Sequence, residues 1–343
     1  MRFGFMVLPR SMEETRAVAA AGESYGFSWI SVADSPTVYE DSYLHQLIVA
    51  QAAPSVQVGP MVSHVVARHP VIVANQLATL NSFTGGRVVG TLATGNSAAR
   101  GLGMKPATLA RLGEAVGAMQ GYWRGEGGAF GDSFIPVTGM VRDACPLLIS
   151  ADGPRAAALA GEVGDGLLYG GTMDPEVRRR RLAAARPGGD AGRAAWIAPT
   201  VAFGEDHATV RDELGAMVIA MANRAMRGDL GERGVPAAVQ DDVLAMRKAY
   251  DYGYHADSSR PRNTGVVSDR LTEHLIDGLC VWGGEARFKA TLDGLAEDGW
   301  TGVMFILGQA EQLSVVHALG TRLRRLGLLS TSAAAPARAA PRS

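Results

Sequence analysis

The chain is poor in cysteine and in long apolar runs, and each shortage excludes a class of protein. Only Cys145 and Cys280 occur among 343 residues, too few for a disulfide framework, which favours a reducing compartment. No apolar run approaches the roughly 20 residues that a membrane-spanning helix requires. The first residues also lack the apolar stretch and cleavage site of a signal peptide. We therefore expect a cytoplasmic protein without a membrane segment.

The balance of charge gives no support to a nucleic-acid partner. The chain has 33 basic and 34 acidic residues and a net charge of −1, so it offers no basic footprint for a phosphate backbone. The seven histidines include no pair at metal-ligand spacing, and without paired cysteines we expect no metal site. A nucleophile elbow of the form Gly-x-Ser-x-Gly is missing too, which argues against hydrolase chemistry.

Short apolar runs alternate with helical segments along the chain, and this alternation is typical of repeated βα units. Ser11 is the expected N-cap of the first helix, with Glu14 three residues further on. Eight such units predict a (β/α)8 TIM barrel, formed as a single domain by residues 1–329. The predicted strands cover residues 3–8, 29–33, 56–62, 87–93, 146–150, 166–170, 196–203 and 303–307.

One interval breaks the alternation. Residues 205–301, between the seventh and eighth strands, are too many for one crossover and predict a long insertion with helices at 207–227 and 236–250. An insertion at this end of a barrel commonly covers a binding site. Residues 330–343 are mainly Ala, Pro, Arg and Ser, a composition typical of a disordered tail.

The most informative segment covers residues 85–103. It indicates a buried strand that ends in a polar, glycine-rich turn, and barrel folds bind ligands beyond the carboxyl ends of their strands. Arg-His-Pro at 68–70, Gly-Gly-Arg at 85–87 and Thr-Gly-Asn-Ser at 94–97 together resemble the bacterial luciferase-like family of flavin-dependent oxidoreductases. The similarity is to the branch that contains methylenetetrahydromethanopterin reductase. We expect Arg68 and His69 themselves to anchor the start of a helix.

The resemblance implies a flavin whose phosphate is held at the turns after the fifth and sixth strands. Backbone N–H groups at a helix start bind phosphate, although the same glycines also suit ordinary tight turns. The turn at 94–97 would meet the flavin ring edge or cap a helix, and the family carries a cis peptide beneath the ring, here expected near Val62-Ser63. The candidate cofactor-binding residues are Val62, Ser63, Thr94, Asn96, Ser97, Ser150, Ala151, Asp152, Gly153, Gly170, Gly171 and Thr172. Asp152 departs from the serine that is commoner in the family.

Three residues are candidates for catalysis. Asp34 follows the second strand, where relatives that use coenzyme F420 often carry an Asp-His pair; here Ser35 replaces that histidine. His64 ends the segment that matches the cis-peptide bulge. His255 lies in the insertion beside Tyr254, and imidazole titrates near neutral pH, so this residue is either a general acid or base or a surface histidine.

The family resemblance implies an FMN-dependent monooxygenase that takes up reduced FMN and uses O2 to oxygenate a small organic substrate. A partner flavin reductase would supply the reduced cofactor, and the family commonly forms homodimers, here through the apolar segment at 44–53. Two alternatives stay open. One is a hydride-transferring oxidoreductase that uses coenzyme F420, and the other is a flavin-binding protein without turnover.

Overall fold

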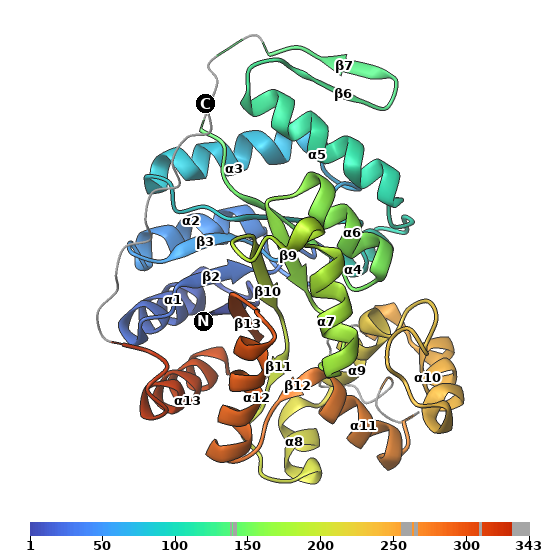
Figure 1. Ribbon diagram of the computed structural model, residues 1–343. Helices are drawn as coiled ribbons and strands as arrows, with labels where there is room; N and C mark the ends of the chain where they lie inside the picture. Colours follow the sequence, from blue (N-terminus) through green and yellow to red (C-terminus); the bar gives the residue numbers. More distant parts are fainter. Residues whose placement is uncertain (138, 140–142, 255–262, 264–266, 309–310, 331–343) are drawn as a thin grey trace.

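A nearly closed barrel of parallel strands, surrounded by helices, forms the body of the protein (Figure 1). The computed structural model describes residues 1–137, 139, 143–254, 263, 267–308 and 311–330. The sheet order is β3-β2-β1-β13-β10-β9-β8-β5-β4, and β11 pairs off this path with both β13 and β12. All pairings along this path are parallel, which confirms the predicted (β/α)8 barrel.

The barrel strands are close to those expected from the apolar runs. They are β1 (Arg2–Val7), β2 (Trp29–Val32), β3 (Gln57–Pro60), β4 (Ser63–His64), β5 (Gly90–Ala93), β8 (Leu147–Ser150), β9 (Gly166–Tyr169), β10 (Ala194–Ile197), β11 (Thr200–Val201), β12 (Cys280–Val281) and β13 (Gly302–Ile306). The third predicted strand, 56–62, ends at Pro60, and β4 follows just beyond its predicted end. The seventh, 196–203, is divided into β10 and β11.

The helices pack around this barrel and above its carboxyl ends. They are α1 (Met12–Tyr25), α2 (Ser42–Ala52), α3 (Pro70–Thr84), α4 (Ser97–Gly101), α5 (Leu109–Trp123), α6 (Pro154–Val163), α7 (Pro175–Ala184), α8 (His207–Leu214), α9 (Ala216–Ala225), α10 (Ala237–Ala249), α11 (Asp269–Leu279), α12 (Glu285–Glu297) and α13 (Gln312–Arg325), with short 3-10 turns η1 (Pro187–Gly189) and η2 (Tyr252–Tyr254). An antiparallel hairpin, β6 (Gly128–Phe130) and β7 (Ser133–Ile135), follows α5 and was not expected.

Local signals set the helix ends as the sequence predicts. The Ser11 hydroxyl accepts from the Glu14 N–H at 3.1 Å, so the expected N-cap of α1 is confirmed. His69 caps α3 by accepting from the N–H of Val71, and Pro70 occupies the first turn, where a missing N–H costs nothing. His69 therefore anchors a helix start, as expected.

A glycine in β3 allows this strand to approach the segment before β5 closely. Val58 exchanges main-chain hydrogen bonds with the chain around Val89, accepting from its N–H at 2.9 Å and donating to the carbonyl of Arg87 at 3.0 Å. A Cβ atom on the next residue, Gly59, would lie 1.9 Å from the carbonyl oxygen of Val89. Only glycine permits this approach of β3 to the segment before β5.

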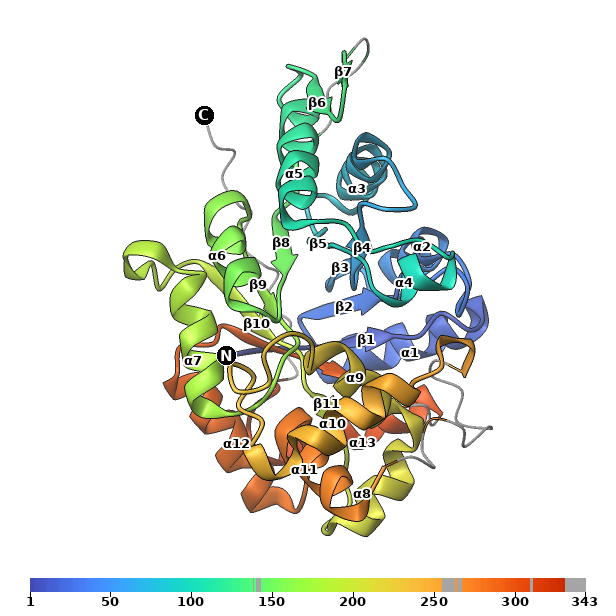
Figure 2. The same cartoon turned by 90° about the vertical axis from the view of Figure 1, so that its right-hand side faces the viewer.

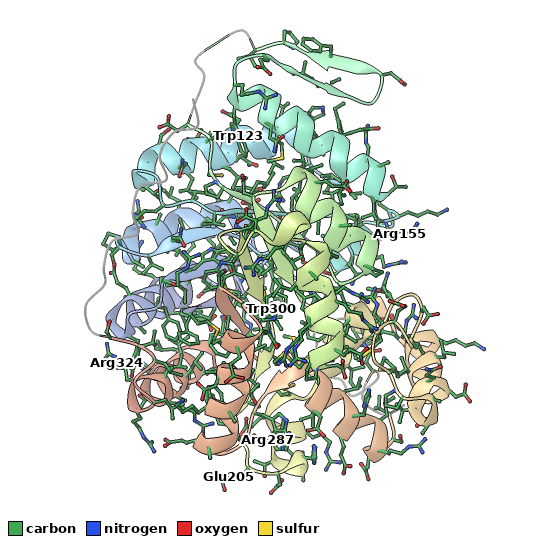
Figure 3. The ribbon with its side chains drawn as sticks, viewed as in Figure 1. Trp123, Arg155, Glu205, Arg287, Trp300 and Arg324 are labelled. Atoms are coloured by element: carbon green, nitrogen blue, oxygen red, sulfur yellow. The ribbon has the colours of Figure 1, made fainter. Side chains whose placement is uncertain are left out.

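The core has two layers with different roles. Between the strands and the outer helices lie side chains such as Phe5, Leu77 and Trp300, all buried; Figure 3 shows Trp300 near the centre of the molecule, where it stacks on Tyr169. Inside the barrel, Trp29 meets Trp196 edge to face with ring centroids 4.9 Å apart. The interior is therefore filled, and a ligand can bind only at an end of the barrel.

The interval between β11 and β13 has two parts. Helices α8–α11 share their own apolar cluster and lie at the end of the molecule away from α3, α5 and the β6–β7 hairpin (Figure 2). In contrast, α12 buries Phe288 and Leu292 in the main core, as an ordinary crossover helix does. The predicted helix at 207–227 is broken at Gly215, whose φ of +51° divides α8 from α9.

Within the part of the chain that the structure describes, no helix is long and apolar enough to cross a membrane. Residues 331–343, nearly all of the segment expected to be a disordered tail, lie outside the described residues.

Candidate functional site

A cavity of about 560 Å³ opens at the carboxyl ends of the barrel strands, beneath α9 and the segment after it. Its volume is in the ordinary range for a site that takes a cofactor or a small ligand. Among the predicted site residues, those that line it are Asp34, Val62, His64, Thr94, Asn96, Ser97, Ser150, Ala151, Asp152, Gly153 and Gly170. Ser63, Gly171 and Thr172 do not line it, and His255 lies outside the described residues.

Asp34 is held by an ion pair at the edge of the cavity. Its side chain is 2% exposed, and both carboxylate oxygens lie 2.7 Å from Nη1 of Arg68. The Ser63 hydroxyl donates to the same carboxylate at 3.1 Å, and the second guanidinium nitrogen of Arg68 reaches Asp41. Asp34 therefore serves first as the partner that keeps Arg68 in place, and its role in catalysis stays a prediction.

The same network extends to Tyr43 on α2. The hydroxyl groups of Tyr43 and Ser63 are 2.8 Å apart, and the guanidinium of Arg68 lies over the Tyr43 ring, 4.9 Å from its centroid. Burial and the charge of Asp34 raise the pKa of Tyr43, so this phenol stays protonated. Ser63 is thus turned toward the network and away from the cavity, although the sequence predicts that it contacts the cofactor.

His64 is a neutral donor in the cavity wall. Burial lowers its pKa, and the charge of Arg68 adds to this effect while that of Asp34 opposes it. The N–H of Ala67 points to Nδ1 at 3.4 Å, which leaves the ring proton on Nε2. Among the described residues, the buried Nε2 has no hydrogen-bond partner, so an acceptor on a bound ligand would satisfy it.

The two turns predicted to bind phosphate are joined by a resident carboxylate. Oδ1 of Asp152 accepts from the N–H of Gly170 at 3.0 Å, and Arg224 donates to the Gly170 carbonyl at 2.7 Å. Thr172 is buried and donates to the carbonyl of Arg233, while Gly171 packs on Tyr169. Asp152 therefore already uses the Gly170 N–H that the sequence offers to a phosphate.

The start of α6 keeps free groups for an anion. Gly153 is its N-cap without a side-chain hydrogen bond, and the first N–H groups of a helix have no partner within it. Arg155 projects outward from this end (Figure 3), and a guanidinium nitrogen of Arg233 would lie 3.2 Å from a Cβ on Gly153. The dipole of α6 and the side chains of Arg155 and Arg233 favour the binding of one negatively charged group here.

The bulge after β3 contains the expected cis peptide at a neighbouring position. The bond is Met61–Val62, one residue earlier than the predicted Val62-Ser63, because Ser63 already pairs with β5 as part of β4. Both Met61 and Val62 line the cavity.

The turn after β5 contacts the insertion. Asn96 precedes α4 but makes no capping hydrogen bond; its Oδ1 instead accepts from the hydroxyl of Tyr252 at 3.2 Å. Ser97 shares a hydrogen bond with Ser35, with 3.0 Å between their oxygens. The prediction that the Asn96 side chain caps a helix is therefore wrong. Any contact of its amide with the ring edge of a ligand would be made beside Tyr252.

The insertion places at the cavity several arginines that the sequence did not predict as site residues. Arg224, Arg227 and Arg233 line it together with Met217 and Met221 of α9. The spacing of Arg224 and Arg227 was the available signal, because residues three apart lie on one helix face and these end an otherwise apolar run. Arg224 donates to the carbonyl of Gly170, 54 residues earlier in the chain, and no local sequence pattern reveals this contact.

A flat tricyclic cofactor fits these surroundings. Leu8, Met61, Leu168 and Ile306 give the cavity an apolar floor, while the residues after β5 and β8 supply polar groups at its sides. The α6 terminus supplies backbone donors for a phosphate. Oxygen and amide donors around an apolar slot are the arrangement that orients a flavin or a deazaflavin.

Comparison with known proteins agrees with this geometry. Over 318 residues the chain is 24% identical to 5,10-methylenetetrahydromethanopterin reductase of Methanolobus tindarius, covering 89% of this chain and 93% of the relative. An F420-dependent glucose-6-phosphate dehydrogenase of Nakamurella multipartita is 27% identical over 207 residues, 52% of this chain and 61% of that protein.

Solved structures share the same barrel. The coenzyme F420-dependent tetrahydromethanopterin reductase of Methanopyrus kandleri superimposes with a TM-score of 0.71 at 18% identity, covering 95% of this chain and 99% of that one. The monooxygenase RslO1 of Streptomyces bottropensis gives 0.65 at 15% identity, with 95% and 100% covered. The family profile described as luciferase-like monooxygenase matches residues 1–302. The chain therefore belongs to the luciferase-like family of oxidoreductases.

Proposed function

We propose that this protein is an oxidoreductase that uses coenzyme F420 to transfer a hydride to or from a small organic substrate. The observation that carries this proposal is the set of guanidinium groups on the cavity wall near the α6 terminus, from Arg155, Arg224 and Arg233. Coenzyme F420 differs from FMN in its longer anionic tail, which such groups favour. The relatives named above as F420-dependent add weight, and we therefore place F420 before the FMN-dependent monooxygenase that the sequence first suggests.

In this proposal the chain's residues bind, orient and shield the cofactor. The α6 terminus and Arg155 hold its phosphodiester, and Met61, Val62 and the floor of the cavity support the ring. Once bound, the deazaflavin supplies the carbon that accepts or donates hydride. Nε2–H of His64 donates a hydrogen bond to a carbonyl of the ring or substrate, and α9 excludes water from above.

Cofactor titration tests the proposal. The purified protein is titrated with F420, with oxidised FMN and, without oxygen, with reduced FMN, and binding is followed by fluorescence and calorimetry. We expect F420 to bind at least tenfold more tightly than either form of FMN. Arg155→Gln should weaken F420 binding several-fold, whereas Arg16→Gln, on the exposed face of α1, should not.

Two other outcomes contradict the proposal in different ways. Preferred binding of reduced FMN, with O2 uptake in the presence of a flavin reductase, supports the monooxygenase. Tight flavin binding without turnover of any kind supports the non-catalytic binding protein.

We also propose that the protein forms a homodimer through α2 and α3. Leu44 and Leu47 on α2 and Ile72 on α3 are large apolar side chains that remain exposed, at 55%, 37% and 54%. Light scattering coupled to size exclusion measures the mass directly. A Leu44→Glu, Ile72→Glu variant should elute as a monomer if this surface is the interface, and a monomeric wild type contradicts it.

A further inference from the structure

We infer that the substrate of the proposed oxidoreductase carries a carboxylate or phosphate group, bound by Arg100, Arg227 and Arg247 where the insertion meets the barrel rim. The inference rests on the proposed function, because only that function makes the bound anion part of a substrate. The anion site itself rests only on the residues that form it.

Two of the three arginines contact one phenol, and the third acts on Arg227 from another element. The guanidinium of Arg100, on α4, lies 5.5 Å from the ring centroid of Tyr252. Arg227, directly after α9, donates from Nη2 to the Tyr252 hydroxyl. Arg247 extends from α10 and, with Arg100, acts electrostatically on Arg227. We call these three residues the guanidinium cluster.

The guanidinium cluster has no counter-ion in the part of the chain that the structure describes. No ion pair within 4.0 Å joins any of its members to a described carboxylate, and Nε of Arg247 is buried without a hydrogen bond. Burial lowers the pKa of Arg227 most, and the charges of Arg100 and Arg247 lower it further, while Tyr252 opposes these effects. Three like charges beside a half-buried site are unfavourable unless an anion joins them.

The carboxylates nearest the cavity are committed elsewhere. Asp34 is paired with Arg68, Asp152 accepts from Gly170, and Glu232 lies 3.6 Å from Arg181. Asp229 is exposed and accepts from the N–H of Glu232. None of these four carboxylates pairs with the guanidinium cluster, so a bound anion would neutralise it.

The position of the cluster favours substrate over the cofactor tail. The cofactor phosphate already has the α6 terminus, which follows β8, whereas Tyr252 ties the guanidinium cluster to Asn96 after β5. Asn223 also donates to the Tyr252 hydroxyl, at 3.0 Å, so this phenol is fixed and presents Arg227 at the cavity wall. Guanidinium groups bind carboxylate and phosphate through paired N–H donors.

Calorimetry with inorganic phosphate tests the inference on the full-length protein, first without cofactor and then saturated with F420. Without cofactor we expect two phosphate sites per chain, at the α6 terminus and at the guanidinium cluster, and with F420 bound only the second. In the F420-saturated protein, Arg227→Gln should weaken phosphate binding at least tenfold, while the F420 dissociation constant changes less than twofold. Arg100→Gln, a substitution at an exposed position that spares the fold, should weaken phosphate several-fold, and Arg16→Gln should match the wild type.

The other outcomes decide whether the guanidinium cluster binds the substrate or the cofactor tail. If F420 displaces the phosphate that depends on Arg227, or if Arg227→Gln weakens both ligands equally, the cluster holds the cofactor tail and the inference is overturned. Phosphate binding to the F420-saturated protein that survives in Arg227→Gln and Arg100→Gln overturns it as well. If F420 does not bind but phosphate does so through Arg227, the proposed function fails while the anion site stands.

Discussion

Two arginine sites flank the same cavity and differ in what neutralises them. On the side of β2 and α3, Arg68 binds Asp34 and Asp41 and stacks on Tyr43. On the insertion side, Arg227 meets a phenol and two more arginines. The first arrangement is complete within the described chain, and the second is not. A compensated arginine stabilises the folded protein, while an uncompensated one is suited to bind an anion.

The largest expected effect comes from breaking the complete site. Asp34→Asn leaves Arg68 half-buried with only the exposed Asp41, and removing one partner of a buried pair costs about 3 kcal/mol or more. Urea denaturation measures the loss in free energy of unfolding. Asp41→Asn, whose side chain is 46% exposed, should cost less than about 1 kcal/mol.

A double replacement sharpens this result. Asp34→Leu with Arg68→Met removes both charges, so most of the lost stability should return. If Asp34→Asn costs no more than Asp41→Asn, the Arg68 site is not structurally complete and the contrast between the two sites disappears.

The next largest effect is expected at Tyr252, which links the insertion to the turn after β5. Tyr252→Phe removes the hydroxyl that contacts Asn96, Asn223 and Arg227, and leaving buried polar partners unsatisfied costs about 1–3 kcal/mol. Hydrogen exchange should quicken in α9. Tyr122→Phe, which loses one exposed bond to Asn75, should leave exchange in α9 unchanged, and equal rates in both variants contradict the role of Tyr252.

A smaller effect, of opposite sign, is expected within the guanidinium cluster. Arg247→Gln removes one repelling charge, so without added anions the protein should gain about 0.5–1 kcal/mol. The neighbouring Lys248→Gln, on the exposed face of α10, should change stability little. Melting temperatures at low and high phosphate provide the measurement, and a clear loss of stability in Arg247→Gln shows that this arginine is already compensated.

The smallest effect concerns His64 and pH. Its folded pKa is lowered by burial, so below the unfolded value of about 6.5 the unfolded chain binds a proton that the folded chain does not. Stability present above pH 6.5 is therefore lost as the pH falls toward the folded pKa. His64→Gln should show a shallower loss between pH 6.5 and 5 than the wild type, and parallel curves contradict a buried neutral imidazole. Burial also lowers the pKa of His274, so His274→Gln provides the comparison variant.

The barrel could be predicted from the sequence because each strand is a short apolar run followed by its own helix. The turns that line the cavity follow from the same logic, since they come directly after those strands. The direction of each side chain could not be predicted: Ser63 turns to Tyr43, and Asp152 takes the N–H of Gly170. The contacts of the insertion could not be predicted because Arg100, Arg227 and Asn96 all contact Tyr252, and two of them lie far from it in the chain.

The approach of β3 to the segment before β5 has a consequence for redesign. Since every side chain larger than hydrogen at position 59 collides with the carbonyl of Val89, the wall there cannot be altered by substitution. Efforts to change which molecule this barrel accepts should therefore vary residues that line the cavity, such as Leu8 or Ile306, and a saturation library should leave codon 59 untouched.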